Sequence, residues 1–341
     1  MPLASQPYVS TEKALVAVLG SLKPEPKWDL VHQAQPVCIN APKPAKQLKT
    51  KHKVAIALPD PQIGYRHLFD QGWSTFHDEA AMDVALQIIA HLEETDRIDY
   101  VINLGDFLDL PSQGRFEQEP AFAGTTQKAL DRGHLFLQQQ RAAAGPKADI
   151  VLIEGNHDRR MEKFILANSA ASWGIKRANM DELPVMSLSY LLRLDEIGVE
   201  YIDAYPAGAY WLTPTLRAIH GTKARSNGST AAAYTNADPH ISTIFGHSHR
   251  LEIQSKTVFN RDEAIRSVAV SPGCLCRTDG AVPSVGSSTH ADGTPAQFHE
   301  NWQQGVAVII LEDDKPYVEL VEIRHGVAWF RGKKFKAQKA S

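Results

Sequence analysis

Five short clusters of carboxylate, amide and imidazole side chains give this sequence its clearest capacity for chemistry. They are Asp60–Gly64, Gly105–Asp109, Gly155–Asp158, His220–Gly221 and Gly246–Arg250. Oxygen and imidazole donors of this kind suit divalent metals such as manganese, iron and zinc. A carboxylate shared by two such ions holds them roughly 3.5–4 Å apart, where both can polarise one phosphoryl group. A water bridging the two ions loses a proton near neutral pH and becomes a nucleophile.

The clusters differ in how much each one indicates by itself. A His-Gly or Gly-Asp pair has little weight, whereas Gly-Asn-His-Asp and Gly-His-x-His are rarer by chance. Glycines beside the donors let the backbone turn sharply off a strand and approach the site closely. The order of the clusters, and their common position after apolar runs, favour one shared metal centre.

The segments that precede the first three clusters have the pattern of buried strands. Val54–Leu58, Tyr100–Leu104 and Ile150–Ile153 are short apolar runs, and each ends just before one cluster. Between them, Ala80–Leu92 and Thr126–Ala142 carry apolar residues at helical spacing. Strands that alternate with helices predict an α/β sheet with helices on its faces. Polar residues just past the carboxyl ends of such strands are typical of ligand sites.

The second half of the chain is predicted to contain more strand. The expected strands are Tyr210–Leu212, Leu216–His220, Ile241–Phe245, Leu251–Val258, Ser267–Val270, Val306–Leu311 and Val318–Arg324. Ala281–Asn301 is rich in Gly, Ser, Thr and Pro and is predicted to be a surface loop, whose His290 and His299 could fold over the site as a lid.

In order and spacing the clusters resemble the calcineurin-like metallophosphoesterases, whose signature is D-x-H, G-D-x-x-D, G-N-H-D/E, H and G-H-x-H. The resemblance covers roughly residues 54 to 275. Ser271–Gly273 and Asn301–Gly305 are similar to the corresponding parts of phage and prophage members. The resemblance implies a four-layered α/β/β/α sandwich of two packed mixed sheets.

The resemblance also implies a role for each metal ligand. Asp60 and His249 would bind the first metal, and Asp106 would bridge both ions. The residues that would complete the second metal site are Asn156, His220 and His247.

Further roles concern the proton and the phosphate charge. His157 would protonate the leaving alkoxide, steadied by Asp158, and Asp109 would orient a ligand. Arginine pairs well with phosphate oxygens. The candidates to neutralise the phosphate are Arg159, Arg160 and Arg250, although each could equally be a solvated surface charge.

Gln62 departs from the family pattern, because the family usually has histidine there. Its amide oxygen can still bind a metal, but it is a weaker donor than imidazole. We therefore expect a looser first metal, ligation through a water, or a preference shifted toward manganese or magnesium. Two divalent ions, with manganese favoured over iron, zinc or magnesium, are the expected cofactors. A degenerate, non-catalytic site is the alternative.

The metal ligands indicate a reaction class and leave the substrate open. A phosphodiesterase acting on nucleic acid or nucleotides is favoured by the phage-like features, by the basic arm Lys43–Lys53 and by the basic segment Arg331–Lys336. Trp73, Phe76 and Trp302 could stack on a base, although packing in the core or in a hydrophobic patch is the more frequent role of such aromatics.

Three other functions stay open. The first is a phosphomonoesterase acting on a phosphoprotein or small metabolite. The second is a non-catalytic metal-binding module. The third is a hydrolase with a serine or cysteine nucleophile, but no Gly-x-Ser-x-Gly elbow surrounds Ser248.

The 341 residues carry a net charge of -3, so any DNA or RNA contact would need a local basic patch. We predict an N-terminal helix and Pro/Lys-rich arm over 1–50, a catalytic domain over 51–331 and a basic tail over 332–341. No apolar run matches a membrane span or a signal peptide. We expect a cytoplasmic protein, in the host cytoplasm if it is phage-encoded.

The three cysteines cannot all pair within the chain, which favours a reducing compartment. Cys274 and Cys276 are close enough in sequence to raise a metal or redox question. Since no second cysteine pair exists to complete a zinc site, we interpret them as small residues in a strand-to-loop turn.

Overall fold

The structure is a computed structural model that describes residues 52–68, 72–114, 118–179, 183–225, 228–261, 263–283 and 300–338. The chain divides into two compact units, Met1–Cys38 and Ile39–Ser341, and the described residues all belong to the second. The predicted N-terminal helix and arm lie outside the described residues, as do His290 and His299.

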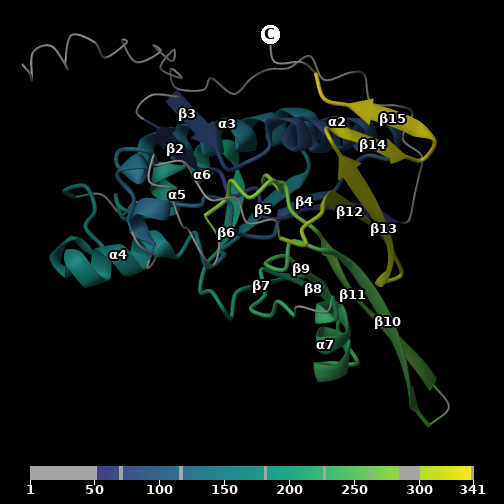
Figure 1. The fold of residues 1–341 in the computed structure, drawn as a ribbon. Helices are drawn as coiled ribbons and strands as arrows, with labels where there is room; N and C mark the ends of the chain where they lie inside the picture. The colour runs from purple at the N-terminus through teal and green to yellow at the C-terminus, as the bar shows by residue number, and fades with distance from the viewer. Residues whose placement is uncertain are drawn as a thin grey trace, which may run out of the picture. The chain divides into compact units, whose positions relative to one another are not determined.

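The larger sheet has eight strands among the described residues, in the order β15-β14-β13-β12-β1-β4-β5-β6 (Figure 1). Its parallel strands are β1 (Lys53–Leu58), β4 (Tyr100–Asn103), β5 (Asp149–Ile153) and β6 (Val199–Ile202). Its antiparallel strands are β12 (Gln304–Glu312), β13 (Lys315–Arg324), β14 (Val327–Phe330) and β15 (Lys333–Lys336). The sheet is therefore mixed.

A second sheet has the order β10-β11-β9-β8-β7. Its strands are β7 (Ala209–Thr213), β8 (Leu216–Ile219), β9 (Ser242–Phe245), β10 (Leu251–Asn260) and β11 (Glu263–Pro272). Strands β8, β9 and β11 run parallel, and β7 and β10 run antiparallel to their neighbours. A small hairpin of β2 (Tyr65–Leu68) and β3 (Gly72–Thr75) follows the first metal-ligand cluster.

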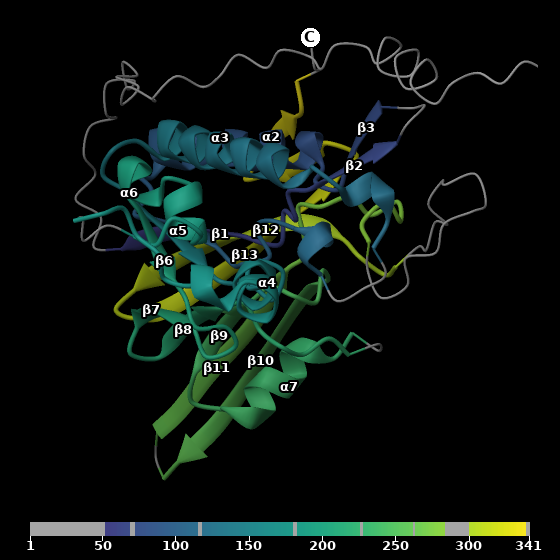
Figure 2. The ribbon, with the colours of Figure 1, turned by 90° about the vertical axis from the view of Figure 1, so that its left-hand side faces the viewer.

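Two long helices, α2 (Glu79–Thr95) and α3 (Thr126–Ala144), lie side by side on the larger sheet (Figure 2). Asp78 caps α2 by accepting hydrogen bonds from the amides of Ala80 and Ala81. The shorter helices are α4 (Arg160–Asn168), α5 (Leu188–Leu191), α6 (Leu194–Ile197) and α7 (Thr230–Ala237). The 3-10 turns are Pro111–Gln113, Pro120–Phe122 and Ala170–Ser172. Among the described residues, no helix is long and apolar enough to cross a membrane.

The two faces of the larger sheet bury different partners. In β1, Val54, Ile56 and Leu58 join the core cluster that contains the apolar faces of α2 and α3. The alternate residues Ala55 and Ala57 join a second cluster, which contains residues of β8, β9 and β11. Because successive strand side chains point to opposite faces, the smaller sheet packs on the face opposite the long helices. Helix α7 shares a third cluster with β9 and β11.

The predicted α/β class with mixed sheets is confirmed. Every strand and helix predicted after residue 53 overlaps an observed element, although Leu104, His220 and Ile241 lie just outside their strands. The prediction of a basic tail over 332–341 was wrong for Lys333–Lys336, which form β15 paired with β14. Phe335 is buried against the core, and this burial explains why the segment is a strand.

Candidate metal centre

The predicted metal ligands come from loops that follow two sets of parallel strands. In the larger sheet, Asp60, Asp106 and Asn156 follow β1, β4 and β5. In the smaller sheet, His220 and His247 follow β8 and β9. Since the strands in each set are parallel neighbours, their carboxyl ends share one edge. The fold thus brings donors from both sheets together.

The backbone at this centre is strained in a consistent way. Asp60, Gln62, Asp106, His247 and His249 have φ values of 37°, 44°, 45°, 65° and 55°. A side chain rarely adopts these left-handed angles, and each costs of order 1–3 kcal/mol. Such strain persists where the surrounding structure imposes it, so its concentration at predicted ligands indicates a functional site.

Two glycines allow the loops to approach each other. A Cβ atom on Gly155 would lie 2.1 Å from the amide nitrogen of Asp106. A Cβ atom on Gly246 would lie 2.5 Å from Asp60 Oδ2. Both distances are shorter than any van der Waals contact, so only glycine fits at these positions.

Asp106 lies at the middle of the centre and is 1% exposed. Its Oδ1 is 3.3 Å from His220 Nε2 and accepts a hydrogen bond of 2.8 Å from the amide of His157. Asn156 Oδ1 is 3.0 Å from the same His220 nitrogen. Asp106, His220 and His247 offer donor atoms that all lie within 4.8 Å of one another. These residues match the second predicted metal site.

A second group of donors forms around Asp60, which is fully buried. Asp60, Asp106 and His249 also offer donor atoms within 4.8 Å of one another. Asp60 accepts hydrogen bonds of 3.0 and 3.1 Å from the amide of His247, and its Oδ1 is 3.3 Å from His249 Nε2. Asp106 therefore belongs to both groups, as a bridging carboxylate would.

Gln62 lies in the first of these two sites. Its Nε2 is 3.5 Å from His249 Nε2, and its Oε1 is buried without a hydrogen-bond partner. An unpartnered buried oxygen costs free energy. The amide nitrogen faces His249, so a half-turn of the amide would turn Oε1 toward a metal ion bound between Asp60 and His249. In that rotamer the donors present fit a divalent cation.

His157 is positioned by two neighbours. Its Nδ1 is 2.5 Å from Asp109 Oδ1, and its Nε2 is 3.0 Å from Nη2 of Arg160. Arg160 also donates to the main-chain oxygen of Asp109 at 2.5 Å and to its Oδ1 at 3.2 Å. His157 Nε2 is 3.7 Å from Asp106 Oδ2, so it faces the centre.

The prediction that Asp158 steadies His157 was wrong, because Asp109 holds that imidazole. Asp158 instead accepts hydrogen bonds from the amides of Phe107, Leu108 and Gly155, at 3.2, 2.9 and 2.9 Å. Burial first, and then the charge of Asp106, raise the pKa of Asp158 to about 7. Asp158 therefore ties together the two loops that carry Asp106 and Asn156.

Burial and pairing together set the charges at the centre. Burial by itself would raise the pKa of Asp106, but His157 and His220 outweigh it and hold the pKa well below its usual range. Burial likewise opposes protonation of His220, yet Asp106 and Asp60 raise its pKa to about 9. Burial and then the charge of His220 lower the pKa of His247 to about 4. The carboxylates thus favour a cation among them.

The remaining predicted arginines lie in ion pairs or on loop carbonyls. Arg159 pairs with Glu154 at 3.0 Å. Arg250 donates to the main-chain oxygen of Asn301 at 3.1 Å and to that of Arg225. Of the three arginines, Arg160 contacts His157 directly, and we therefore treat it as the phosphate-binding candidate.

Two aromatic side chains flank the imidazoles. Trp302, which was predicted as a stacking candidate, meets the ring of His249 edge-on with centroids 4.2 Å apart. Tyr205, which the sequence analysis missed, lies 5.6 Å from the ring of His220. No local pattern marks Tyr205, because its position depends on how the loop after β6 folds.

The other predicted aromatics have different surroundings. Trp73 stacks on His67 with centroids 4.4 Å apart, in the hairpin of β2 and β3. Phe76 is fully buried in a small cluster with Phe122 and the cysteines. Of the three predicted aromatics, Trp302 is therefore the one that contacts a predicted metal ligand.

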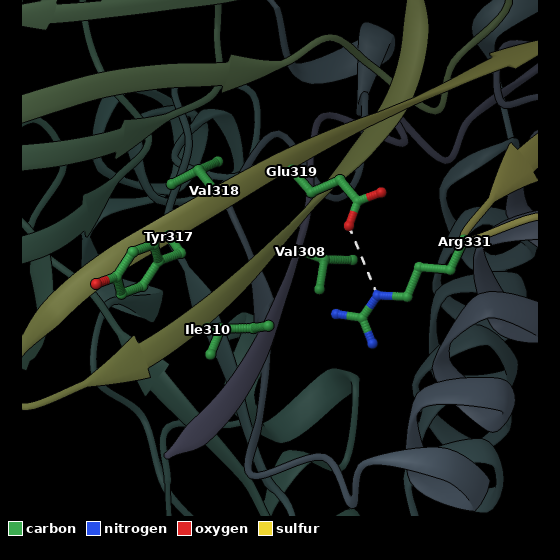
Figure 3. A pocket seen from close by; sticks show the side chains of 6 residues that line it. All are labelled: Val308, Ile310, Tyr317, Val318, Glu319 and Arg331. Carbon is green, nitrogen blue, oxygen red and sulfur yellow. Dashed lines mark ion pairs between the residues drawn. The ribbon is translucent and has the colours of Figure 1, made fainter.

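A shallow pocket lies elsewhere, on strands β12 and β13 beside the turn at Arg331 (Figure 3). It is lined by Val308, Ile310, Tyr317, Val318, Glu319 and Arg331. Two of these lining residues, Arg331 and Glu319, form an ion pair of 3.6 Å. None of these residues belongs to the predicted metal centre.

Comparisons with known proteins neither support nor contradict the predicted family. No protein-family model matches the chain, and no curated protein matches it. Among solved structures, the chain is similar to GAP50, the anchor in the inner membrane complex of Plasmodium. The two are 9% identical with a TM-score of 0.36, over 84% of this chain and 90% of that one. A likeness at this level carries no argument about function.

Proposed function

We propose that this chain is a phosphoester hydrolase that depends on two divalent metal ions. The observation that carries the proposal is the position of Asp106, which belongs to two groups of metal donors at once. One carboxylate between two donor groups is the arrangement that a two-metal phosphoesterase requires. We further propose that the stacking of helices and sheets is the four-layered α/β/β/α sandwich of the calcineurin-like metallophosphoesterases.

The residues that would hold the first ion are Asp60, Gln62, Asp106 and His249. Those that would hold the second are Asp106, Asn156, His220 and His247. When bound, two such ions would polarise the phosphoryl group and lower the pKa of a water molecule. A donor set of carboxylates, amides and imidazoles without thiolate favours manganese, iron or zinc, and we propose manganese.

The protein's own contribution to the chemistry is positioning and proton transfer. Asp109 fixes the ring of His157 so that Nε2 faces Asp106. When Nε2 carries a proton and Arg160 has moved from it onto a phosphate oxygen, His157 can donate that proton to the departing alkoxide oxygen. Arg160, whose guanidinium lies 3.0 Å from the same nitrogen, can pair with a phosphate oxygen.

For the substrate we propose a phosphodiester of a nucleic acid or nucleotide. Trp302 lies beside His249 and Tyr205 lies beside His220, so an aromatic side chain adjoins each donor group. Aromatic faces stack on bases with little dependence on sequence. A diester is the substrate class that offers a base on either side of the reacting phosphate.

The first experiment compares bis-p-nitrophenyl phosphate, p-nitrophenyl phosphate and a dinucleotide, each with manganese. Asp106→Ala should abolish turnover of all diesters, since both donor groups lose their shared ligand. His157→Ala should lower the turnover rate of the dinucleotide by roughly 10²–10⁴-fold, the usual contribution of a general acid. His67→Ala, in the β2–β3 hairpin, is the control and should keep full activity.

If p-nitrophenyl phosphate were the only compound hydrolysed, the proposed substrate would change from a phosphodiester to a phosphomonoester. If no substrate reacts with any divalent metal, the catalytic proposal fails and a metal-binding module takes its place.

A further inference from the structure

Two buried cysteines lie against the far side of the His249 ring. Cys274 and Cys276 are both free and fully buried. Backbone bridges hold them in place, from Cys274 to Gln304 and from Cys276 to His77. The donor atoms of Cys274, Cys276 and His249 lie within 4.8 Å of one another. The segment after β11 therefore brings two sulfur atoms to an imidazole that the sequence places 25 or more positions away.

The two ring nitrogens of His249 lie next to different kinds of side-chain group. Nε2 is 3.3 Å from Asp60 Oδ1 and 3.5 Å from Gln62 Nε2. Nδ1 is 3.9 Å from Cys276 Sγ. One ring edge thus meets oxygen and amide donors, and the other meets thiols. Trp302 packs against the ring and holds this orientation.

The spacing around Nδ1 suits a tetrahedral ion. With zinc–sulfur bonds of about 2.3 Å and zinc–nitrogen bonds of about 2.0 Å, donor atoms on one ion lie roughly 3.5 Å apart. The observed 3.9 Å between Cys276 Sγ and His249 Nδ1 is close to that value. The three donor atoms all lie within 4.8 Å of one another, and the fourth position of a tetrahedral ion would be left to a further ligand such as water.

We propose that Cys274, Cys276 and His249 Nδ1 form a binding site for a thiophilic divalent cation of the zinc and cadmium class. Thiolate donors select such ions over manganese and magnesium. Binding replaces the two thiol protons, which leave to solvent, and two thiolates neutralise the charge of one divalent ion. A neutral assembly suits a fully buried position. The site does not depend on the proposed hydrolase activity, although it uses the other nitrogen of a ligand assigned to that centre. If ions occupied both nitrogens at once, the ring would also lose its N–H proton to solvent and bridge them as an imidazolate.

The test is a titration of the reduced, metal-free full-length protein with cadmium chloride. Thiolate coordination should produce a sulfur-to-cadmium charge-transfer band in the ultraviolet that saturates at one equivalent. Cys274→Ser and Cys276→Ser should each weaken the band, and the double variant should lose it. Cys38→Ser, which changes the third cysteine, should keep it. Asp106→Ala should also keep it, because that variant removes only the shared oxygen ligand of the proposed catalytic centre.

X-ray absorption at the cadmium edge of the wild-type protein provides a measurement that does not depend on variants folding. We expect sulfur and nitrogen neighbours around the first equivalent of cadmium. A shell of oxygen and nitrogen alone, or a charge-transfer band that survives in the double variant, would overturn the proposal. If the wild-type protein hydrolysed no phosphoester but still gave the charge-transfer band, the proposed function would fail and this site would stand.

Discussion

At the scale of single residues, the pair of His157 and Asp109 is the proposed proton donor to the leaving group. The two side chains are 2.5 Å apart, and Asp109 is fully buried. The carboxylate fixes which ring nitrogen faces the centre, because Nδ1 is occupied and Nε2 is turned toward Asp106. In the proposed reaction Asp109 would act through His157, as a positioning residue.

Asp109→Asn should lower kcat for a dinucleotide by roughly 10²-fold, the lower end of the range for general acid catalysis. The loss should be much smaller for bis-p-nitrophenyl phosphate, since p-nitrophenolate leaves without needing a proton. Steady-state kinetics on both substrates make the comparison, with Asp131→Asn on the exposed side of α3 as control. An equal loss on both substrates would contradict the positioning role.

At the scale of elements, hydrogen bonds at the start of α2 connect this helix to β12 and to the loop after β11. Asp78 accepts hydrogen bonds from Ala80 and Ala81 through one carboxylate oxygen, and from Gln304 at the start of β12 through the other. Its amide donates to the main-chain oxygen of Leu275, next to the two cysteines. One side chain thus joins a helix end, a strand and the loop beside the candidate centre.

Asp78→Ala should reduce the free energy of unfolding by about 1–2 kcal/mol, since the helix loses its cap. Urea unfolding of the metal-free protein measures the change. Asp131→Ala, an exposed position on α3, should change it by no more than about 0.5 kcal/mol. If the two variants proved equally stable, the capping role of Asp78 would have to be abandoned.

At the scale of the whole described unit, the candidate centre lies where loops from both sheets meet. Asp60 and Asp106 follow strands of the larger sheet, whereas His220, His247 and His249 follow strands of the smaller one. A metal ion bound by donors from both sheets would link them in the folded state and not in the unfolded chain. Metal binding should therefore stabilise the protein.

Manganese at a free concentration of 100 times its dissociation constant should add about 2.7 kcal/mol to the free energy of unfolding, by mass action. Thermal unfolding with manganese and with a chelator measures the difference. Asp106→Ala should show little response to manganese, whatever its own stability. A variant that responded as strongly as the wild type would place the stabilising ion elsewhere.

The sequence by itself determined the local features of this protein. The apolar runs before Asp60, Asp106 and Asn156 became β1, β4 and β5, because burial on both faces requires continuous apolar strands. The period of apolar residues likewise located α2 and α3. The clusters of donors could be found because each is a short string of neighbouring residues. Phosphoester hydrolysis stays a prediction that the experiments above must test.

Only the tertiary structure decided which distant side chains meet. Asp158 adjoins His157 in sequence, yet the hydrogen bond to the imidazole comes from Asp109, 48 positions away. His249 lies beside Cys274 and Cys276 as a third donor. Lys333–Lys336 form a strand because they pair with β14 and Phe335 packs in the core. Periodicity and propensity act over a few residues. Contacts between loops depend instead on strand order and on the turn that each loop makes, which no local pattern records.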